Sequence, residues 1–435
     1  MTLDSRVSTP SARRRTETTT IAVMGLGYVG LPTALAMYDG AMRVIGLEVS
    51  ADRVARIRHG EPDLLPDDRR RLRAARRDPE RFVVTTDVAA TAEADAVIVC
   101  VPTPVDASLT PDLTWLRTAC ATVVACARPG QVLILTSTSY VGCTRDLLVE
   151  PLSRRGLRVG QDIFVAFSPE RINPGSDAFD LASVPRVVGG VTQECALRAA
   201  DVLRRSCPVT HLVSSLESAE MVKLLENTFR AVNIALANEV ADVCRRFDLN
   251  PVEVIDAAAT KPFGFMPFYP GPGVGGHCIP CDPHYLLWQL RREHVHPPVI
   301  SAAMQDISTR PARIVERATE VLDRAGKTLS RSHVLVAGLA YKPNVADTRE
   351  SPALDIIEGL ARRASQVSVY DPIVPSVRVG DRLYSSVSGD LRADSYDLVV
   401  VCCHHDAMDT QLFDGDSLVL DATFSLPPSA NTHLP

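Results

Sequence analysis

The chain has 435 residues, of which 46% are hydrophobic and 23% are charged, so it can form two or three globular domains with well-filled cores. Its formal net charge of −6 excludes a general affinity for nucleic acid or for an anionic membrane surface. The eleven cysteines are scattered and mostly lie in apolar runs, which favours reduced thiols in the cytoplasm over a disulfide framework.

Residues 1–18 are polar and contain no apolar stretch, which excludes a secretory signal and predicts a disordered tail. No later run is apolar for long enough to predict a membrane-spanning helix. We therefore expect a globular protein that is ordered from residue 19 onwards.

A buried parallel strand is predicted at Thr20–Met24, and the sequence Gly25-Leu-Gly27-Tyr-Val-Gly30 follows it directly. A helical pattern comes next, then a strand at Arg43–Leu47 that ends at Glu48. This strand–GxGxxG–helix–strand–acid order is typical of a turn that binds a dinucleotide at a helix N-terminus, and a glycine turn without a ligand is the alternative. Glu48 would bind the adenosine ribose and repel a 2′-phosphate, so we expect NAD and not NADP, with Arg53 as a candidate to flank the adenosine.

Further strands alternate with helical patterns, as a doubly wound parallel sheet requires. They are predicted at Phe82–Thr85, Ala96–Val101, Val132–Thr136, Phe164–Phe167 and Val187–Val191. Ligands of such sheets bind at the carboxyl ends of the strands. Thr103, Ser137 and Thr138 follow strand ends and are therefore candidate cofactor contacts, and Glu170 also lies at a strand end.

A long apolar helix is predicted at Leu216–Phe247, because neither glycine nor proline interrupts this stretch. Its apolar positions exceed one buried stripe, so we expect a buried spine between domains and the interface of a homodimer. Lys223 and Asn227 are one turn apart and share a face of the helix. The alternative for Lys223 is an ordinary surface lysine.

The stretch Phe263–Pro283 is crowded with glycine and proline, so it is predicted to be a loop with a defined path. Cys278 has His277 before it and Asp282 four residues after it, as expected of an activated nucleophile. A structural cysteine in a tight turn is the alternative. Cys278 and Cys281 also form a CxxC pattern, which leaves open a redox disulfide or a zinc site, although no second CxxC supplies the four ligands that structural zinc needs.

A second α/β unit follows a helix predicted at Ala303–Asp323. Its strands are predicted at His333–Gly338, Gln366–Tyr370, Leu398–Cys403 and Ser417–Leu420, and its first helix at Leu354–Arg363. It has no GxGxxG, so we expect a Rossmann-like domain adapted to a different ligand. Lys342, Arg349 and Glu350 lie in its first strand-to-helix loop, and the two cations suit a diphosphate.

Six stretches carry a resemblance to a known family: GLGYVGLP, STSYVGCT, FSPER, AEMVKLLENTFRAVNIALANE, PFGFMPFYPGPGVGGHCIPCDP and GLAYKPNVADTRESPALDI. On these motifs the chain resembles the UDP-glucose/GDP-mannose dehydrogenase family from residue 20 to its end. The cysteine loop and FSPERINPG look most like the branch that acts on UDP-N-acetylhexosamines. The expected fold is two Rossmann-like doubly wound domains joined by the long helix, with an NAD-binding domain at 19–205, a central helical domain at 206–325 and a nucleotide-sugar-binding domain at 326–435.

The resemblance implies two NAD-linked oxidations of a sugar C6 alcohol to a carboxylate, without release of the aldehyde. It makes Cys278 the nucleophile, Lys223 and Asn227 the pair that stabilises the oxyanion, and Asp282 a carboxylate that acts with a bound water as base. It assigns Glu170 to thioester hydrolysis and Thr138 to a place near nicotinamide and water. The expected cofactor positions are Gly25, Gly27, Tyr28, Val29, Gly30, Glu48, Arg53, Thr103, Thr138 and Arg349. The expected nucleotide-sugar positions are Glu170, Arg171, Ile172, Lys223, Asn227, Arg230, Gly275, Tyr341 and Lys342.

Three positions depart from the family pattern. Pro174 replaces a second glutamate that UDP-glucose dehydrogenases usually have, Cys281 replaces a frequent lysine, and Thr423 replaces an arginine that helps to hold the nucleotide. We expect a cytoplasmic homodimer that acts on UDP-glucose or UDP-N-acetylglucosamine, with TDP-glucose and UDP-N-acetylmannosamine as alternatives. A dehydrogenase that stops after one oxidation and a non-catalytic sugar-nucleotide sensor are the competing functions.

Overall fold

The computed structural model describes residues 19–61, 64, 66–106, 108–171, 184–276, 278–388, 395–409, 412–413 and 417–435. The predicted tail, Ile172, Pro174 and His277 lie outside these residues. The described residues form two compact units. Unit 1 comprises those within Met1–Thr103, Leu113–Ser137 and Gly142–Glu220, and unit 2 those within Pro104–Asp112, Thr138–Val141 and Met221–Pro435. The predicted domain boundaries stay predictions.

Unit 1 is built on an eight-stranded sheet with the strand order β3-β2-β1-β4-β5-β6-β7-β8. Its strands are β1 (Thr20–Met24), β2 (Arg43–Leu47), β3 (Phe82–Thr85), β4 (Ala96–Val99), β5 (Val132–Leu135), β6 (Phe164–Phe167), β7 (Arg186–Gly190) and β8 (Thr210–Val213). All neighbours pair in parallel except β6 and β7. The first six strands have the order of a dinucleotide-binding Rossmann fold, whose switch point lies between β1 and β4.

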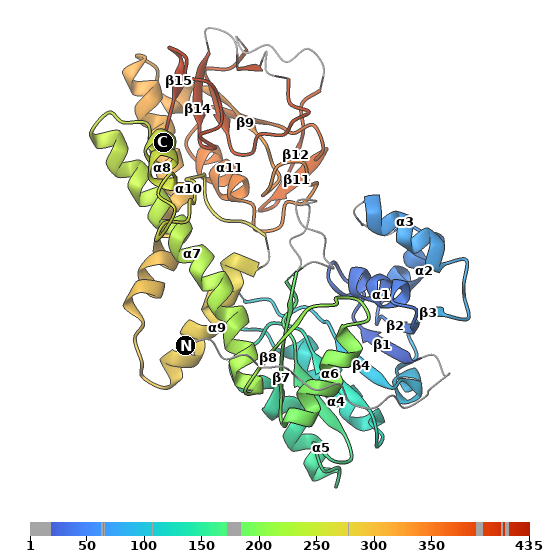
Figure 1. Cartoon of the computed structure of the whole chain (residues 1–435). Coiled ribbons are helices and arrows are strands. Elements are labelled where there is room, and N and C mark those ends of the chain that lie inside the picture. Colours follow the sequence, from blue (N-terminus) through green and yellow to red (C-terminus); the bar gives the residue numbers. More distant parts are fainter. Residues whose placement is uncertain are drawn as a thin grey trace. The chain divides into compact units, whose positions relative to one another are not determined.

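Helices of unit 1 connect these strands and pack on the sheet (Figure 1). They are α1 (Gly30–Asp39), α2 (Ala51–His59), α3 (Pro66–Ala75), α4 (Thr114–Cys126), α5 (Glu150–Arg154) and α6 (Gln193–Leu203). Side chains of α1 and α6 such as Leu35 and Leu203 share one core with strand residues such as Ile21 and Ile134. The apolar residues of these strands are thus buried against the helices, as the uninterrupted apolar runs predict.

Strands β4 and β5 end earlier than predicted. The Val101 N–H donates to Ser137 Oγ at 2.9 Å instead of continuing the strand ladder. The polar side chains that follow the strands therefore cross-link the two strand ends, where a ligand of this fold would bind.

Unit 2 contains a five-stranded parallel sheet with the order β10-β9-β13-β14-β15, and a separate hairpin. The sheet strands are β9 (His333–Ala337), β10 (Gln366–Tyr370), β13 (Leu398–Val401), β14 (Leu418–Asp421) and β15 (Thr432–His433), and the hairpin is β11 (Ser376–Val379) with β12 (Arg382–Ser385). This is the second common order of doubly wound sheets, with its switch point between β9 and β13. The predicted Rossmann-like character of this half is confirmed.

The other helices of unit 2 are α8 (Pro251–Ala259), α9 (Cys278–Arg292), α10 (Pro298–Arg324) and α11 (Pro352–Ala361). Helix α11 begins two residues before its predicted start, because the Ser351 hydroxyl caps it and a proline suits the first helical position. A small core made by Ala231, Ala235, Ile279 and Met304 joins the long helix to α9 and α10. This core fixes the start of α9, which carries the predicted nucleophile.

The prediction of a loop through Pro283 is wrong at its end, since α9 begins at Cys278. Two prolines suggested a loop, but both are tolerated in the helix. Pro280 lies in the first turn, where an amide N–H would have no helical acceptor, and Pro283 lies in a buried segment whose packing outweighs one lost hydrogen bond.

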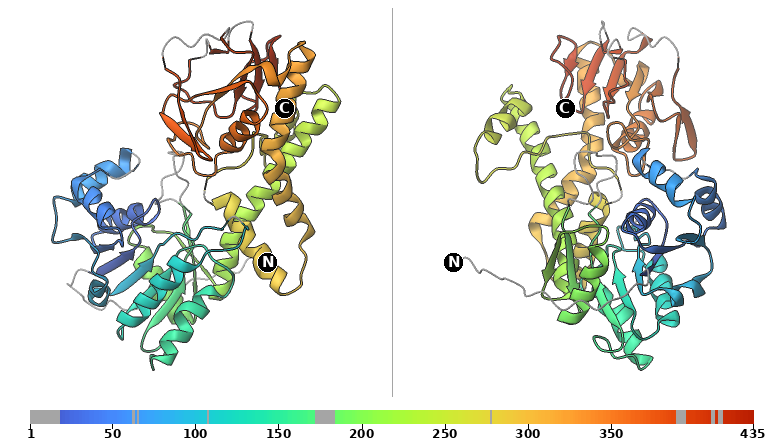
Figure 2. Two further views of the ribbon diagram at one scale, coloured as in Figure 1. Left: turned by 180° about the vertical axis from the view of Figure 1, so that it is seen from behind. Right: turned by 45° about the vertical axis from the view of Figure 1, so that its right-hand side comes forward.

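The long helix α7 runs over Leu216–Arg246, one residue shorter than predicted. Its first residues belong to unit 1 and the rest to unit 2, where it lies beside α10 (Figures 1 and 2). The expected buried spine is only partly correct, because Leu225, Leu236 and Val243 are 57%, 54% and 49% exposed. Among the described residues, no helix is both long and apolar enough to cross a membrane.

Candidate active site

The glycine turn after β1 has the close contacts that a dinucleotide-binding turn requires. Gly25 has a φ of 88°, and a Cβ there would lie 2.5 Å from the Cys100 carbonyl oxygen. A Cβ on Gly30 would lie 1.8 Å from the Gly25 oxygen, so a larger residue would push the start of α1 away from the strand. A Cβ on Gly27 would meet nothing within 4 Å, which leaves open space for a pyrophosphate next to the helix N-terminus.

Glu48 and Arg53 hold opposite sides of this turn. The Leu26 N–H donates to Glu48 Oε2 at 3.0 Å, and Arg53 Nε donates to the Leu26 carbonyl at 2.6 Å. The Arg53 Nη2 is buried and has no hydrogen-bond partner among the described residues. A polar group of a bound dinucleotide would satisfy this donor, so the residues of unit 1 fit NAD.

Other predicted ligand positions of unit 1 lie near the same edge of the sheet. Tyr28 is 42% exposed, and Thr103 is buried just beyond the end of β4. Glu170 Oε2 lies 2.5 Å from Arg186 Nη1, and Glu170 Oε1 accepts a hydrogen bond from the Arg171 N–H at 2.8 Å. The pairing of Glu170 with Arg186 was not expected from the sequence, because Arg186 is the first residue of β7 and lies 16 positions after Glu170.

In unit 2, the glycine loop packs against the loop between β9 and α11. A Cβ on Gly275 would lie 2.5 Å from the Tyr341 Cβ and 2.7 Å from the Glu350 carbonyl oxygen. The Gly276 N–H donates to the Arg349 carbonyl oxygen at 2.9 Å. These contacts explain why glycine is needed here and bring the predicted sugar-binding residues Gly275 and Tyr341 together.

Asp282 lies in the second turn of α9 and is only 1% exposed. The Asn227 side-chain amide donates to Asp282 Oδ2. Burial raises the Asp282 pKa to about 6, although Lys223 and the hydrogen bond from Asn227 act in the opposite direction. A carboxylate with this pKa can accept a proton near neutral pH, as its predicted role as a base requires.

Cys278 is the first residue of α9 and is accessible to solvent. Protein atoms nevertheless surround much of its thiol, and this loss of hydration together with the nearby Asp282 carboxylate raises its pKa. Lys223, Arg349 and Arg230 act in the opposite direction. The predicted influence of Lys223 therefore has the expected sign, but it does not produce a lowered pKa.

The cations that act on Cys278, and Lys342 that neighbours one of them, come from separate elements of unit 2. Arg230 lies on α7, whereas Lys342 and Arg349 lie in the loop between β9 and α11. Burial and the neighbouring Arg230 lower the pKa of Lys342. The resemblance assigns Arg349 to the cofactor, and here it pairs with Asp347 at 2.6 Å while also acting on the pKa of Cys278. This concentration of positive charge suits a diphosphate.

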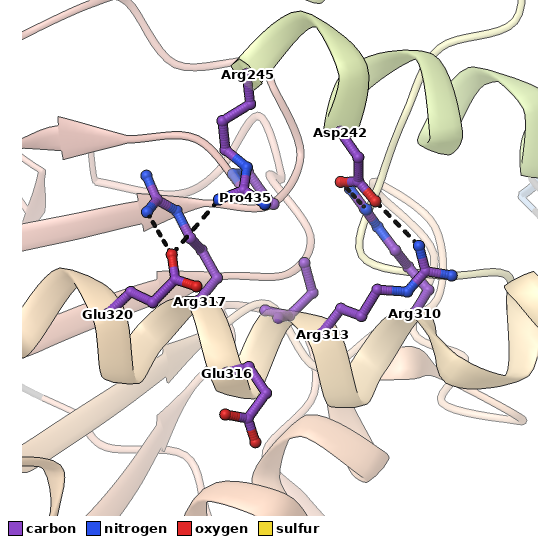
Figure 3. Close-up of a pocket in the computed structure, with 9 residues that line it drawn as sticks. Asp242, Arg245, Arg310, Arg313, Glu316, Arg317, Glu320 and Pro435 are labelled. Atoms are coloured by element: carbon purple, nitrogen blue, oxygen red, sulfur yellow. Dashed lines mark hydrogen bonds and ion pairs between the residues drawn. The ribbon is translucent and has the colours of Figure 1, made fainter.

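A polar pocket lies between α7 and α10 in unit 2 (Figure 3). Arg310 is 1% exposed, its Nη1 lies 2.8 Å from Asp242 Oδ1, and its Nε donates to the Gly271 carbonyl at 3.1 Å. The Gly271 N–H donates to Asn238 Oδ1 at 2.9 Å. Both peptide groups of Gly271 are therefore held, so Asn238 and Arg310 anchor the middle of the glycine loop. Sequence reasoning missed this anchor. Its only signal in the sequence is that two polar residues, Asn238 and Asp242, lie one turn apart on α7.

Thr423, which follows β14 and departs from the family pattern, makes its hydrogen bonds with the neighbouring Asp421. Asp421 Oδ1 accepts hydrogen bonds from the Thr423 N–H at 2.9 Å and from the Thr423 hydroxyl at 2.6 Å. Thr423 thus closes its own turn and does not supply the cation that arginine would.

No group of three or more His, Cys, Asp or Glu side chains could hold a metal ion within the part of the chain that the structure describes. Cys278 and Cys281 have no further ligand of this kind there. The zinc alternative thus has no support in the described residues.

A Rossmann unit that fits a dinucleotide and a second unit with an accessible cysteine, a buried carboxylate and a basic loop indicate an NAD-dependent oxidoreductase. Three models of the UDP-glucose/GDP-mannose dehydrogenase family match the chain: the NAD binding domain at residues 19–206, the central domain at 217–306 and the UDP binding domain at 335–424. The chain belongs to this family.

Individual relatives agree with this placement. UDP-N-acetyl-D-glucosamine 6-dehydrogenase of Pseudomonas aeruginosa is 35% identical over 388 residues, which cover 88% of this chain and 90% of the relative. UDP-N-acetyl-D-mannosamine dehydrogenase of Pyrococcus horikoshii is 35% identical over 88% of this chain and 89% of that protein. A solved structure of UDP-D-ManNAc dehydrogenase from Pyrococcus horikoshii is 31% identical, covers 96% of this chain and 98% of that chain, and has a TM-score of 0.86.

The predicted enzyme class and cofactor are therefore confirmed. The protein is an NAD-dependent nucleotide-sugar dehydrogenase that oxidises a C6 alcohol. The assignments of individual site residues remain predictions.

Proposed function

We propose that the protein oxidises the C6 alcohol of a UDP-linked gluco-configured hexose, glucose or N-acetylglucosamine, to the carboxylate in two steps without releasing the aldehyde. The observation that carries this proposal is the position of Cys278, one helical turn before the buried base Asp282 and within the influence of Lys223. The name of the Pseudomonas aeruginosa relative favours UDP-N-acetylglucosamine. UDP-N-acetylmannosamine and TDP-glucose are the alternatives.

In the first oxidation, a base must remove the proton of the C6 hydroxyl. With a pKa of about 6, Asp282 is mostly ionised at pH 7 and can receive this proton, directly or through a water. NAD, when bound, accepts a hydride from C6 in each oxidation. Gly27, Glu48 and Arg53 would hold it, as their geometry in unit 1 supports.

The second oxidation needs a tetrahedral carbon, which Cys278 provides by attacking the aldehyde. The raised pKa keeps the resting thiol protonated. Because its pKa is about 6, Asp282 releases the first proton to solvent at pH 7, and the carboxylate can then accept the thiol proton during the attack. Lys223 and the amide of Asn227 would stabilise the oxyanion of the resulting thiohemiacetal. Oxidation then gives a thioester on Cys278, which water hydrolyses. The role of Glu170 in this hydrolysis and the place of Thr138 beside nicotinamide rest on the family resemblance alone.

The diphosphate would bind the basic residues near this thiol. Arg230 and Lys342 lie close enough for each other's charge to matter, because Arg230 contributes to the lowered pKa of Lys342. A dianionic diphosphate relieves this repulsion, so its binding there is favourable. Tyr341 and Gly275 border the same loop contact, and Arg171 and Ile172 are added by resemblance.

Cys278→Ala tests the mechanism directly. We expect its rate of sugar-acid formation to fall by at least about 10³-fold, because no thiohemiacetal can form, while NAD binding is retained. Cys281→Ala is the matched control and should keep most of the activity. The wild type should release two NADH per sugar consumed. One NADH per sugar would favour a dehydrogenase that stops at the aldehyde, and binding without turnover would favour a sensor.

We also propose a cytoplasmic homodimer built on the exposed face of α7. Leu225, Phe229, Leu236, Val243 and Phe247 are each at least 46% exposed and recur along one side of the helix and just past its end. Such a stripe favours burial against a second copy. Leu236→Glu should give a monomer by light scattering at micromolar concentration, whereas the exposed Val88→Glu in unit 1 should not. None of the eleven cysteines, all of which the structure describes, forms a disulfide, which suits the reducing cytoplasm.

A further inference from the structure

The first turn of α9 holds two thiols of different accessibility. Cys278 is the first residue of the helix and is exposed, whereas Cys281 is 6% exposed. Residues three apart in a helix face the same side, and helical geometry places their Cα atoms about 5 Å apart. Disulfides span Cα distances of about 4.4–6.8 Å, so the backbone spacing of this pair already lies in the required range.

The backbone at this place can make the remaining adjustment. Helical Cβ atoms three residues apart are about 5–6 Å apart, whereas a disulfide needs about 4 Å. The first amides of a helix have no acceptor within the helix, and Pro280 between the two cysteines has no N–H at all. Gly276, with a φ of 80°, precedes the turn. A shift of Cys278 toward Cys281 therefore breaks few hydrogen bonds.

We propose that Cys278 and Cys281 form a reversible disulfide when the enzyme meets a peroxide, and that Cys281 thereby protects the nucleophile from irreversible oxidation. Only the predicted loss of turnover rests on the proposed role of Cys278. The formation of the disulfide itself depends on the geometry of the helix.

The two cysteines differ in the way that this chemistry needs. Of the eleven cysteines, Cys278 is exposed, Cys126 is half-buried and the other nine are buried, so a peroxide in solution reaches Cys278 first. Burial and the adjacent Asp282 raise the pKa of Cys281 to about 12, so this thiol stays protonated and unreactive toward peroxide. The pKa of Cys278 is raised as well, but Lys223, Arg349 and Arg230 counteract this rise.

The reaction is balanced with peroxide as the two-electron oxidant. Cys278 gives up its thiol proton to the Asp282 carboxylate and attacks one peroxide oxygen, the O–O bond breaks, and the departing hydroxide takes up this proton to become water. Cys281 then attacks the sulfenic sulfur of Cys278, the S–O bond breaks, and the hydroxyl leaves as water with the proton of the Cys281 thiol. A dithiol such as dithiothreitol restores both thiols by exchange and is itself oxidised.

Cys281 has no role in the proposed oxidation of the sugar, and the family resemblance leads one to expect lysine there. A thiol in this place can capture the sulfenic acid of Cys278 before a second peroxide reaches it. A sulfenic acid without such a partner proceeds to the sulfinic acid, which dithiothreitol does not reduce.

The test uses the full-length protein treated with hydrogen peroxide and then with dithiothreitol. The wild type should lose activity, lose two titratable thiols and the mass of two hydrogens, and regain its activity on reduction. A peptide that links Cys278 to Cys281 should appear in the non-reduced digest. Cys281→Ala should be as active before treatment but recover about tenfold less activity, because it gains the mass of two oxygens at Cys278. Cys126→Ala, which lies on α4 of unit 1, should behave as the wild type does.

Equal recovery of Cys281→Ala and the wild type would overturn the proposal, as would a wild type that gains two oxygens and no disulfide. Thiol count and mass are measured without turnover. A disulfide that forms while activity persists would therefore refute the role of Cys278 as nucleophile and leave the disulfide standing. If Cys281→Ala does not fold, Cys281→Ser gives the same comparison, and rapid recovery by this variant also refutes the proposal.

Discussion

The first strand and turn of unit 1 can be compared directly with those of unit 2. In unit 1, Gly25 follows β1 with a φ of 88°, and its N–H donates to Leu47 O at the end of β2 at 2.8 Å. In unit 2, Gly338 follows β9 with a φ of 86°, and its N–H donates to Tyr370 O at the end of β10 at 2.8 Å. The same backbone turn therefore occurs twice in the chain.

An acid follows the second strand of each unit, but the two acids have different surroundings. Glu48 is half-buried and accepts hydrogen bonds from the N–H groups of Leu26 at 3.0 Å and Ser50 at 3.1 Å. Asp371 is buried, and both of its oxygens accept hydrogen bonds from the protein. Its partners are the N–H groups of Leu339, Ala340, Ile373 and Val374, together with the His405 ring.

This difference shows how one fold serves two ligands. Glu48 keeps part of its carboxylate accessible, so it can bind a ribose. Asp371 uses its carboxylate to hold its own loops, which turns a ligand-binding position into a structural one. We therefore expect ligand binding in unit 2 to fall to the long loop before α11, which contains Tyr341, Lys342 and Arg349. The fold alone thus does not predict the ligand, and the exposure of the acid distinguishes a position that can bind one from a position that is structural.

The largest effect should come from Asp371→Asn. The amide would point N–H groups at backbone N–H groups and leave buried donors unpaired, so we expect the free energy of unfolding to fall by about 3–5 kcal/mol. Chemical denaturation followed by circular dichroism measures this change. Hydrogen bonds from Ile373, Leu339 and His405 lower the Asp371 pKa against the effect of burial. Its stabilisation is therefore present at neutral pH and is lost as the pH falls below the usual carboxyl value.

Glu48→Gln is the matched control in unit 1. It removes one charge at the equivalent position, but its amide contacts are partly solvated, so its loss of stability should stay below about 1 kcal/mol. If both variants lose the same stability, the contrast between a structural acid and a ligand-binding acid is wrong.

Asp282 provides a second contrast within unit 2, because burial raises its pKa to about 6 from a usual value of 3.8. A folded-state pKa above the unfolded one destabilises the ionised protein. The penalty is absent below pH 3.8, grows as the pH rises through 6 and reaches about 3 kcal/mol. Asp282→Asn should therefore be more stable than the wild type at pH 8 by up to this amount, although the loss of the Lys223 partner opposes the gain.

The activity of the wild type should rise with pH over the range in which the ionisation of Asp282 lowers its stability. The wild-type kcat/KM should rise between pH 5 and 7 as Asp282 ionises, with a midpoint near its pKa of about 6. Asp282→Asn should lose nearly all activity at every pH. The exposed Asp248→Asn should leave both the rate and the stability unchanged. A wild-type rate that is independent of pH between 5 and 7 would show that Asp282 is not the base.

The sequence predicts unit 1 well because its signals are local. The glycine turn, the strand after it and Glu48 lie within thirty residues, so periodicity and spacing identify them. The structural role of Asp371 depends on His405, which is distant in sequence. It also depends on the two loops that follow β9 and β10, whose backbone N–H groups converge on the Asp371 carboxylate. Such a cluster is invisible to periodicity.

The cysteine region was predicted in part for the same reason. Its glycines indicated close backbone contacts, which Gly275 makes with Tyr341. The start of α9 at Cys278 was missed, because buried packing outweighs the local preference of proline. The anchoring of Gly271 by Arg310 was missed as well, since it joins the glycine loop to a residue of α10 that lies 39 positions later in the sequence.

The smallest effect concerns the choice of cofactor. Glu48 and Arg53 bind the N–H and the carbonyl of the same residue, Leu26, so an acid and a base flank one turn. An ionised Glu48 repels a 2′-phosphate, whereas an arginine beside such a turn attracts one. Glu48→Gln keeps the shape of the side chain and removes its charge. The repulsion should disappear, and the Arg53 Nη2, which has no hydrogen-bond partner among the described residues, becomes available to the phosphate.

We expect the ratio of kcat/KM for NADP to that for NAD to rise about tenfold in Glu48→Gln, which corresponds to about 1.4 kcal/mol of relative transition-state stabilisation. Steady-state kinetics with both cofactors at a fixed saturating sugar nucleotide measure this ratio. Glu48→Gln/Arg53→Ala should lose the gain, because the phosphate then has no cation at this turn. Glu61→Gln, an exposed acid of unit 1, is the control and should leave the ratio unchanged. If the wild type already uses both cofactors equally, Glu48 does not discriminate between them, and its position after β2 is no more functional than that of Asp371.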